Sequence, residues 1–426
     1  MDLLERVRGE MAFEGNIWKS YLYRFLMRCE LWLPIWVVYL QKQRGLSLTQ
    51  ITLLDIPFFL LIVAAEVPTG AVADRFGRRI SLILGSLMIA IAFFIFGIAD
   101  NYIIILVSWT AWGFGQTFQS GADAAILYDS LKQIGREDDF QKINGRMWAL
   151  TSFAALIAIL IGAPIAAATS FTVPIFLSVG IALAAIPVAF SMHEPRAEHD
   201  ESRDRYFQTL FAGVRTAWDQ PTLRYVILYS GLMTAVTFSP MVFQQPFLDH
   251  HGIGTGNLGL WQAPVRGIGI AAALGAHQVL ARAGYRASFF ALPALIGGCS
   301  FALAGVDRAW VFGAFLGMGL VAGAQSPMLA TYINKRIPSE RRATILSVQG
   351  VAGSFMLAGS QPISGMIADA FGLRPLFLTF GVATIVLVPV VLVLWMRAED
   401  AERAELEALD RELFGRERTT DAVPVS

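Results

Sequence analysis

Charged side chains are scarce in this 426-residue chain: Asp, Glu, Lys and Arg make up 15% of it, against about 25% in ordinary soluble domains. Hydrophobic residues make up 55%, and the mean hydropathy is +0.55. Basic and acidic residues both number 33, so there is no excess positive charge for binding nucleic acid. The only cysteines are Cys29 and Cys299, too few for a disulfide framework or a Cys-based zinc site. This composition argues against a soluble enzyme.

Several enzyme motifs are missing as well. The chain contains no Gly-x-x-x-x-Gly-Lys phosphate-binding loop, no Gly-x-Ser-x-Gly and no His-Glu-x-x-His. We therefore expect no ATP-driven pumping, no enzymatic activity, no cofactor and no metal site. A membrane receptor that transports nothing is the remaining alternative to a transporter.

Long apolar runs are what the chain has instead. A membrane-spanning helix needs about 20 mostly apolar residues. We expect an all-α polytopic membrane protein with six spans in residues 1–192, a polar linker at 193–221, six spans in 222–397 and a charged tail at 398–426. The linker is expected to contain a short amphipathic helix around Tyr206–Trp218, and the tail a solvated helix. The twelve expected spans lie near 20–40, 49–70, 80–98, 102–127, 142–168, 171–191, 223–246, 257–280, 287–305, 309–333, 343–368 and 375–396.

Basic residues fix the expected orientation, because loops on the cytoplasmic side retain Lys and Arg. With these spans, 26 of the 33 basic residues fall on one side of the membrane and 4 on the other. The protein is therefore expected in the cell membrane, with both termini on the cytoplasmic side.

A weak internal repeat relates the two halves. Arg75, Gly77, Arg79 and Ser81, in the loop after span two, match residues 207 positions later in the loop after span eight; the matching residues are Arg282, Gly284, Arg286 and Ser288. Duplicated six-span halves with a site between them are typical of transporters.

The loop after span two carries a specific resemblance. Gly70-x-x-x-Asp74-Arg75-x-Gly77-Arg78-Arg79 is similar to the signature loop of the major facilitator superfamily. The resemblance implies that fold and secondary transport by alternating access. It also implies that Gly70, Asp74, Arg75, Gly77, Arg78 and Arg79 form a latch that locks the halves together on the cytoplasmic face in one state. Asp129, at the end of span four, is expected to pair with Arg78 or Arg79; ordinary loop solubility is the alternative for this basic segment.

Two other segments bear on the resemblance. Gly365–Arg374 looks like a second signature, but the expected topology places it at the outer end of span eleven. The arginine that many proton-driven antiporters of the family carry in span four is absent near Trp109–Gly115. Antiport is therefore less firmly implied than membership of the family.

Polar and aromatic side chains gather on single faces of several expected spans. Charged groups inside a membrane are costly and usually face a cavity, so we expect these faces to line a substrate cavity, with helix packing as the alternative. For Arg266, a buried ion pair is an equal alternative. The expected cavity residues are Arg28, Trp32, Trp36, Trp109, Trp112, Gln116, Gln119, Ser120, Tyr229, Thr237, Gln244, Gln262, Arg266 and Gln325.

Four acidic residues are candidates for proton coupling: Asp123, Glu30, Asp55 and Glu66. Structural pairing is the alternative for each. We expect export of a hydrophobic or amphipathic small molecule by proton antiport, from a monomer in the lipid bilayer. Uptake or facilitated diffusion of a small organic solute is the alternative.

Overall fold

The computed structural model describes residues 3–195, 214–215, 218–336 and 339–420, and every regular element within them is a helix. The expected linker helix at Tyr206–Trp218 lies almost entirely outside the described residues. Eight helical segments in the described part of the chain are long and apolar enough to cross a membrane. The chain is therefore an all-α, multi-pass membrane protein.

Two groups of helices follow one another along the chain. The first comprises α1 (Leu3–Arg28), α2 (Trp36–Lys42), α3 (Leu48–Leu53), α4 (Asp55–Phe76), α5 (Arg78–Ile98), α6 (Tyr102–Gln119), α7 (Ala122–Gln133), α8 (Phe140–Ala168) and α9 (Thr172–Ser191). The second comprises α11 (Pro221–Phe238), α12 (Gln244–His250), α13 (Leu258–Gly305), α14 (Ala314–Arg336), α15 (Ser339–Phe371) and α16 (Leu373–Thr420). Within these groups, short 3-10 turns in the described residues connect consecutive helices: η1 (Glu137–Asp139), η3 (Pro240–Phe243), η4 (Thr255–Asn257) and η5 (Ala309–Gly313).

Helix α13 contains two spans, because its backbone leaves the helical region at Gly284 (φ 75°, ψ 161°). Gly77, between α4 and α5, has nearly the same conformation (φ 99°, ψ 150°). Such positive φ angles favour glycine. The two glycines are the central pair of the sequence repeat, so the halves turn in the same way at matching positions. With α13 divided here, the described helices make the twelve expected passes.

The first, fourth and seventh spans, which were expected to be continuous, are broken. The first ends at Arg28 and resumes at Trp36, and the seventh breaks at Ser239 before η3. Pro34 and Pro240 lie in these breaks and have no backbone N–H to continue a helix. The fourth breaks at Ser120–Gly121, where Gly121 has φ 77°. The breaks in the first and seventh spans fall at matching places in the two halves, and paired interruptions of this kind mark substrate sites in transporter folds.

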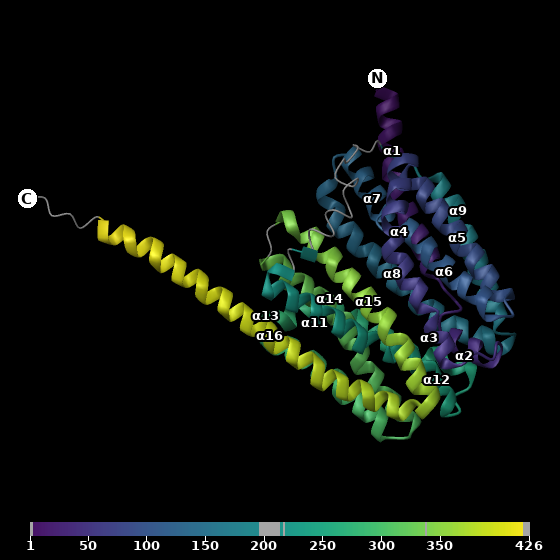
Figure 1. Ribbon diagram of the computed structural model, residues 1–426. Helices are drawn as coiled ribbons and strands as arrows, with labels where there is room; N and C mark the ends of the chain where they lie inside the picture. The colour runs from purple at the N-terminus through teal and green to yellow at the C-terminus, as the bar shows by residue number, and fades with distance from the viewer. Residues whose placement is uncertain (1–2, 196–213, 216–217, 337–338, 421–426) are drawn as a thin grey trace, which may run out of the picture.

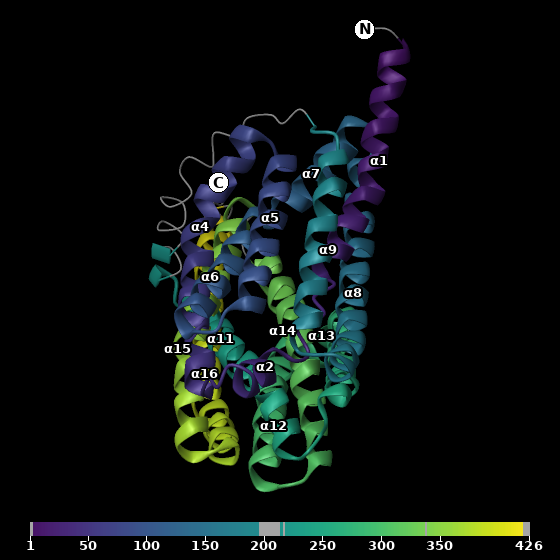
Figure 2. The ribbon, with the colours of Figure 1, turned by 90° about the vertical axis from the view of Figure 1, so that its right-hand side faces the viewer.

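The helices of the two halves form two bundles lying side by side (Figures 1 and 2). We call the end at which α1 begins and Gly77 lies the basic end, and the end that carries α2, α3 and α12 the opposite end. Near the opposite end α15 packs against α3, and η4 packs against α8. One hydrophobic core there includes Val38 and Leu54 of the first half together with Phe247 of the second. The final helix, α16, continues past the bundle as an exposed extension, as expected for the tail (Figure 1).

Candidate functional site

A cavity of about 470 Å³ lies inside the first half, between α1, α4, α6, α7 and α8. Its wall combines apolar and polar side chains and carries charges of both signs. Six of the residues expected at the site lie on this wall: Arg28, Glu66, Gln116, Gln119, Ser120 and Asp123. Sequence reasoning missed Asn144 and Trp148 of α8, which line the same cavity.

An ion pair crosses the cavity wall. Arg24 of α1 contacts Asp123 of α7, with 2.6 Å between Nη2 and Oδ2, and the side chains are 12% and 21% exposed. The break at Gly121 starts a new helix just before Asp123, which places this carboxylate in the first turn of α7. Trp148 stacks on the guanidinium of Arg24, 5.6 Å from the ring centroid. The pair is therefore held from three elements while it stays in contact with the cavity.

Three buried polar atoms on the cavity wall have no hydrogen-bond partner among the described residues: Arg24 Nε, Gln119 Nε2 and Asn144 Oδ1. Buried polar groups are nearly always hydrogen-bonded in folded proteins. These two donors and one acceptor belong to residues that line one cavity, so its wall holds unsatisfied hydrogen-bonding groups.

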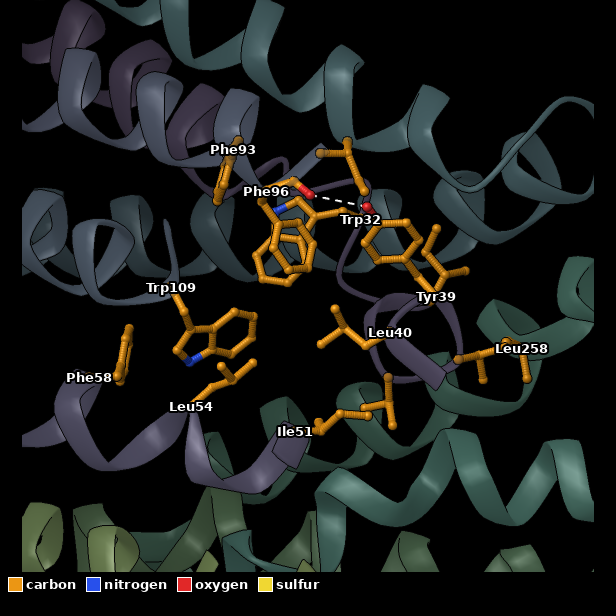
Figure 3. Packing of buried hydrophobic residues seen from close by; sticks show 14 of the residues in the cluster. Trp32, Tyr39, Leu40, Ile51, Leu54, Phe58, Phe93, Phe96, Trp109 and Leu258 are labelled. Atoms are coloured by element: carbon orange, nitrogen blue, oxygen red, sulfur yellow. Dashed lines mark hydrogen bonds between the residues drawn. The ribbon is translucent and has the colours of Figure 1, made fainter. Parts of the chain in front are cut away.

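The four tryptophans expected in the cavity pack beside it in an aromatic cluster. Figure 3 shows two of them, Trp32 and Trp109. Trp32 is 1% exposed and Trp109 is 5% exposed. Trp36 packs on Trp109 with 4.8 Å between ring centroids, and Trp112 packs edge-on against Trp32 at 5.1 Å. None of the four is among the residues that line the 470 Å³ cavity. The four indole rings pack against one another behind the cavity, and other residues, among them amides and charged groups, form its surface.

Asp55 lies at the edge of this aromatic cluster. Its carboxylate is buried, with the residue 6% exposed, and accepts a hydrogen bond of 3.0 Å from the indole N–H of Trp109. The structure therefore separates this acid from Asp123 and Glu66, which reach the cavity.

The expected cavity residues of the second half divide into two groups. Tyr229, Thr237, Gln244 and Gln325 are buried. Tyr229 donates to the backbone oxygen of Phe289, and the Thr237 hydroxyl donates to Gln325 Oε1 at 3.4 Å. Each of these donors has its hydrogen bond within the half, so the contacts are those of helix packing.

Gln262 and Arg266 of α13 face the first half. The Gln262 amide donates to the backbone oxygen of Pro34 at 2.9 Å, in the break of the first span. One turn further along α13, the exposed Arg266 interacts electrostatically with Arg28 and with Glu30. Arg28 and Glu30 of the first half are thus within electrostatic range of Arg266 in the second half.

The signature loop is tied to its own half. Arg78 forms an ion pair with Asp129 of α7 and donates to the Ala125 backbone oxygen at 2.7 Å. The backbone N–H groups of Arg78 and Arg79 donate to the carboxylate of Glu194 at 2.7 and 2.8 Å. An acid at a helix N-terminus satisfies unpaired N–H groups and complements the helix dipole. Glu194 follows α9, and nothing in its local sequence marks it as the cap of α5.

Several hydrogen bonds between the two halves lie toward the opposite end. Gln245 of α12 accepts from the N–H groups of Val37 and Val38 at 2.9 and 3.4 Å and donates to Leu33 at 3.0 Å. Lys42 forms an ion pair with Asp249. Sequence reasoning could not pair these residues, because they lie more than 200 positions apart.

Asp369, in the signature-like segment at the end of α15, also joins the halves. Its carboxylate accepts hydrogen bonds from the N–H of Leu48 at 3.0 Å, the N–H of Thr49 at 2.7 Å and the Thr49 hydroxyl at 2.6 Å. It therefore caps α3 from the other half. The described residues contain no cluster of His, Cys, Asp and Glu suited to a metal ion.

Comparison with known proteins agrees with this architecture. The family model of the Major Facilitator Superfamily matches residues 22–360. The uncharacterized MFS-type transporter YxaM of Bacillus subtilis (strain 168) is 22% identical over 382 residues, which cover 84% of this chain and 90% of that protein.

Two solved structures share the fold. The nucleoside transporter NupG aligns with a TM-score of 0.71 at 12% identity, over 90% of this chain and 98% of that one. A bacterial homolog of the human lysosomal transporter Spinster, in an inward-facing and unoccupied conformation, aligns with a TM-score of 0.70 at 16% identity, over 93% and 98%.

Proposed function

Because the chain belongs to the major facilitator superfamily of transporters, we propose that it exports an amphipathic small molecule by proton antiport, with Asp123 as the coupling acid. The observation that carries this proposal is the Arg24–Asp123 ion pair on the cavity wall. Protonating Asp123 removes its charge and releases Arg24, so proton binding changes the charge that the cavity wall presents to a substrate. Substrate and proton then compete for the same wall, which is the requirement for antiport.

The composition of the cavity supports an amphipathic substrate. Its surface carries amides and charges together with apolar side chains, among them Met27, Ile62 and the exposed Trp148. A substrate with both a polar group and an apolar body matches this combination better than a purely apolar one. We therefore narrow the expected amphipathic substrate to molecules that bring hydrogen-bonding groups to Gln119 and Asn144. The buried Gln119 Nε2 and Asn144 Oδ1 atoms lack hydrogen-bond partners.

The orientation of the protein in the membrane follows from the charge distribution. Basic loops stay in the cytoplasm, so the basic end is assigned to the cytoplasmic face of the cell membrane, with both termini there. The cavity lies toward this end, since its lining includes Asp123 in the first turn of α7. In this assignment the opposite end is closed by the contacts of Asp369 and Gln245, and the molecule works as a monomer.

The test uses everted membrane vesicles with an imposed pH gradient, followed by a fluorescent amine. Lipophilic cations, neutral compounds and organic anions are added in turn. We expect one class to collapse the gradient with the unaltered protein and not with Asp123→Asn or Asp74→Asn. Asp123→Asn is expected to retain exchange of labelled substrate across the membrane, because only coupling is lost. Asp74→Asn is expected to lose exchange as well, because it acts on the latch.

Each of the other possible results would favour a different function. Collapse that persists in Asp123→Asn would contradict its role as the coupling acid. Substrate flux that ignores the gradient would favour facilitated diffusion, and gradient-driven accumulation in the direction of proton flow would favour uptake. Absence of flux and exchange with every class would favour the receptor alternative.

A further inference from the structure

Spans two and eleven end in the same sequence pattern. Span two runs through α3 and α4 to the basic end and finishes with Gly-x-x-Ala-Asp-x-Phe-Gly-x-Arg at residues 70–79. Span eleven is α15, which runs the other way and finishes with the same pattern at residues 365–374. Gly77 and Gly372, which follow the two helices, have positive φ angles of 99° and 90°. Helices of different halves therefore end alike at opposite ends of the molecule.

The glycines that begin the two patterns have different surroundings. At the opposite end α15 packs closely on α3. A Cβ added at Gly365 would lie 2.7 Å from the Leu48 backbone oxygen and 2.8 Å from Thr49 Cα, so this approach requires glycine. Among the residues that the structure describes, no atom lies within 4 Å of a Cβ added at Gly70. The pattern at the opposite end is thus packed against the other half, while the glycine of the signature loop faces open space.

The arginine of each pattern fastens the loop to its own half. Arg79 donates from Nη1 to the backbone oxygen of Met192 at 3.3 Å, just after α9. Arg374 donates from Nε to the backbone oxygen of Ala304 at 2.9 Å, near the end of α13. Carbonyl groups at the end of a helix have no partner within it and readily accept such bonds. With its loop fixed in this way, Asp369 is held in position to meet α3.

Asp369 caps α3 by contacts that can be released. The first N–H groups of a helix have no partner within it. Those of Leu48 and Thr49 donate to Asp369 at 3.0 and 2.7 Å, whereas that of Gln50 donates to the Ser47 hydroxyl at 3.2 Å. Ser47 and Gln50 form a reciprocal capping box, so α3 keeps a cap of its own when Asp369 withdraws. Asp369 is exposed, so water can replace it as the acceptor.

We propose that residues 365–374 form a second latch, which holds the opposite end closed and opposes the signature loop at the basic end. Asp369 joins the halves only while the opposite end is closed, because α3 and α15 belong to different halves. In each state of the cycle the same two spans are then tied at one end and apart at the other. The inference goes beyond the proposed export, because it involves neither the substrate, the coupling proton nor the direction of transport.

The test measures the separation of the halves at both ends in the purified full-length protein. Serine replaces both cysteines, and pairs of nitroxide labels are read by pulsed electron resonance. Labels at Thr169→Cys and Arg308→Cys report on exposed loops of the two halves at the opposite end. Labels at Asp138→Cys and Ala281→Cys report on exposed positions of the two halves at the basic end.

Variants of the cap should open the opposite end. Asp369→Ala removes both carboxylate oxygens and should raise the ratio of open to closed forms about fivefold, which corresponds to the ~1 kcal/mol typical of a helix cap. The distance at the basic end should shorten at the same time. Asp369→Asn keeps one acceptor oxygen, and Thr49→Val removes only the hydroxyl contact of 2.6 Å. Each of these two variants should cause a smaller shift.

A glycine variant tests the close packing independently of the charge. Gly365→Ala should force α15 away from α3 and shift both distances in the same direction as Asp369→Ala. Gly359→Ala, on the same helix with no described atom within 4 Å of its added carbon, is the matched control for packing. Asp100→Asn, an exposed acid in a loop at the opposite end, is the matched control for charge. Neither control should change either distance.

Opposition between the two latches predicts the effect of combining variants. Asp74→Asn should shift both distances in the reverse direction, and the double variant with Asp369→Ala should lie between the two single variants. A double variant that matches Asp369→Ala would overturn the opposition.

Unchanged distances in Asp369→Ala and Gly365→Ala would overturn the second latch. Widening at the opposite end without shortening at the basic end would overturn it as well, because Asp369 would then hold only the start of α3. Failure of the proposed export is distinct from both results, since it appears as absence of coupled flux in vesicles while these distances still respond.

Discussion

At the scale of single residues, Arg24 and Asp123 depend on one another for stability as well as for coupling. Both side chains are mostly buried, at 12% and 21% exposed. A charge left without its partner in such a place keeps its desolvation cost and loses the compensating attraction. This makes the pair a sensitive probe of the cavity wall.

We expect Asp123→Asn and Arg24→Gln each to reduce the free energy of unfolding by roughly 1–3 kcal/mol. The double variant should lose less than the sum of the two, because it leaves no unpaired charge. Thermal unfolding in detergent measures all three. Additive losses would mean that the two charges act independently and would remove the basis for coupling through this pair.

The buried carboxylate of Asp55 gives a second residue-scale prediction. Trp109→Phe removes the 3.0 Å hydrogen bond to Asp55 and leaves the carboxylate without that donor. We expect a loss of about 1–3 kcal/mol and a lower unfolding temperature. Asp55→Asn is the matched control and should cost less, because the amide oxygen still accepts from Trp109. A lower unfolding temperature for Asp55→Asn than for Trp109→Phe would indicate that the charge itself is required.

Sequence reasoning at this scale succeeded for local partners. Arg78 and Asp129 both lie near the basic end of consecutive hairpins, so topology alone brought them within reach, and they form an ion pair. It could not identify Glu194, Gln245 or Asp369 as caps, because each caps a helix from a distant part of the chain. The helical stripe also could not distinguish Gln116, on the cavity wall, from Trp109, in the packed cluster.

At the scale of elements, hydrophobicity predicted where spans occur but not where they break. Pro34 and Pro240 could have suggested the breaks in the first and seventh spans, since both lack a backbone N–H. The break at Gly121 has a weaker signal, because glycine is common inside membrane helices. These interruptions matter for the site, since they place Glu30 and Asp123 beside helix ends.

Close approach of α8 and α13 across the halves provides the element-scale prediction. A Cβ at Gly259 would clash with the backbone oxygen of Ile159. Gly259→Ala should therefore force these helices apart at the opposite end and reduce transport at least tenfold, with normal insertion in the membrane. Gly267→Ala, on the same helix with nothing within 4 Å of its added carbon, is the control. Equal transport by both variants would show that the approach is not required.

At the scale of the whole molecule, alternating access requires the contacts at the opposite end to form and break in each cycle. At that end, α2, α3 and Pro34 of the first half contact α12, α15 and the start of α13 of the second half. Lys42 and Asp249 form an accessible pair at this end, with side chains 50% and 33% exposed. They form an ion pair between the halves without contributing to the cavity, so they report the motion separately from substrate binding.

Replacing both by cysteine, in the background without Cys29 and Cys299, allows the closed end to be locked. Oxidation of Lys42→Cys with Asp249→Cys should abolish transport, and a reductant should restore it, because the disulfide prevents the halves from separating. The matched control is Glu14→Cys with Arg136→Cys, whose ion pair of 3.4 Å lies within the first half; its oxidation should leave transport intact. Binding of a ligand from the basic end should survive the lock between the halves. Full transport with the Lys42–Asp249 disulfide formed would mean that the opposite end does not open during the cycle, and would contradict alternating access in this chain.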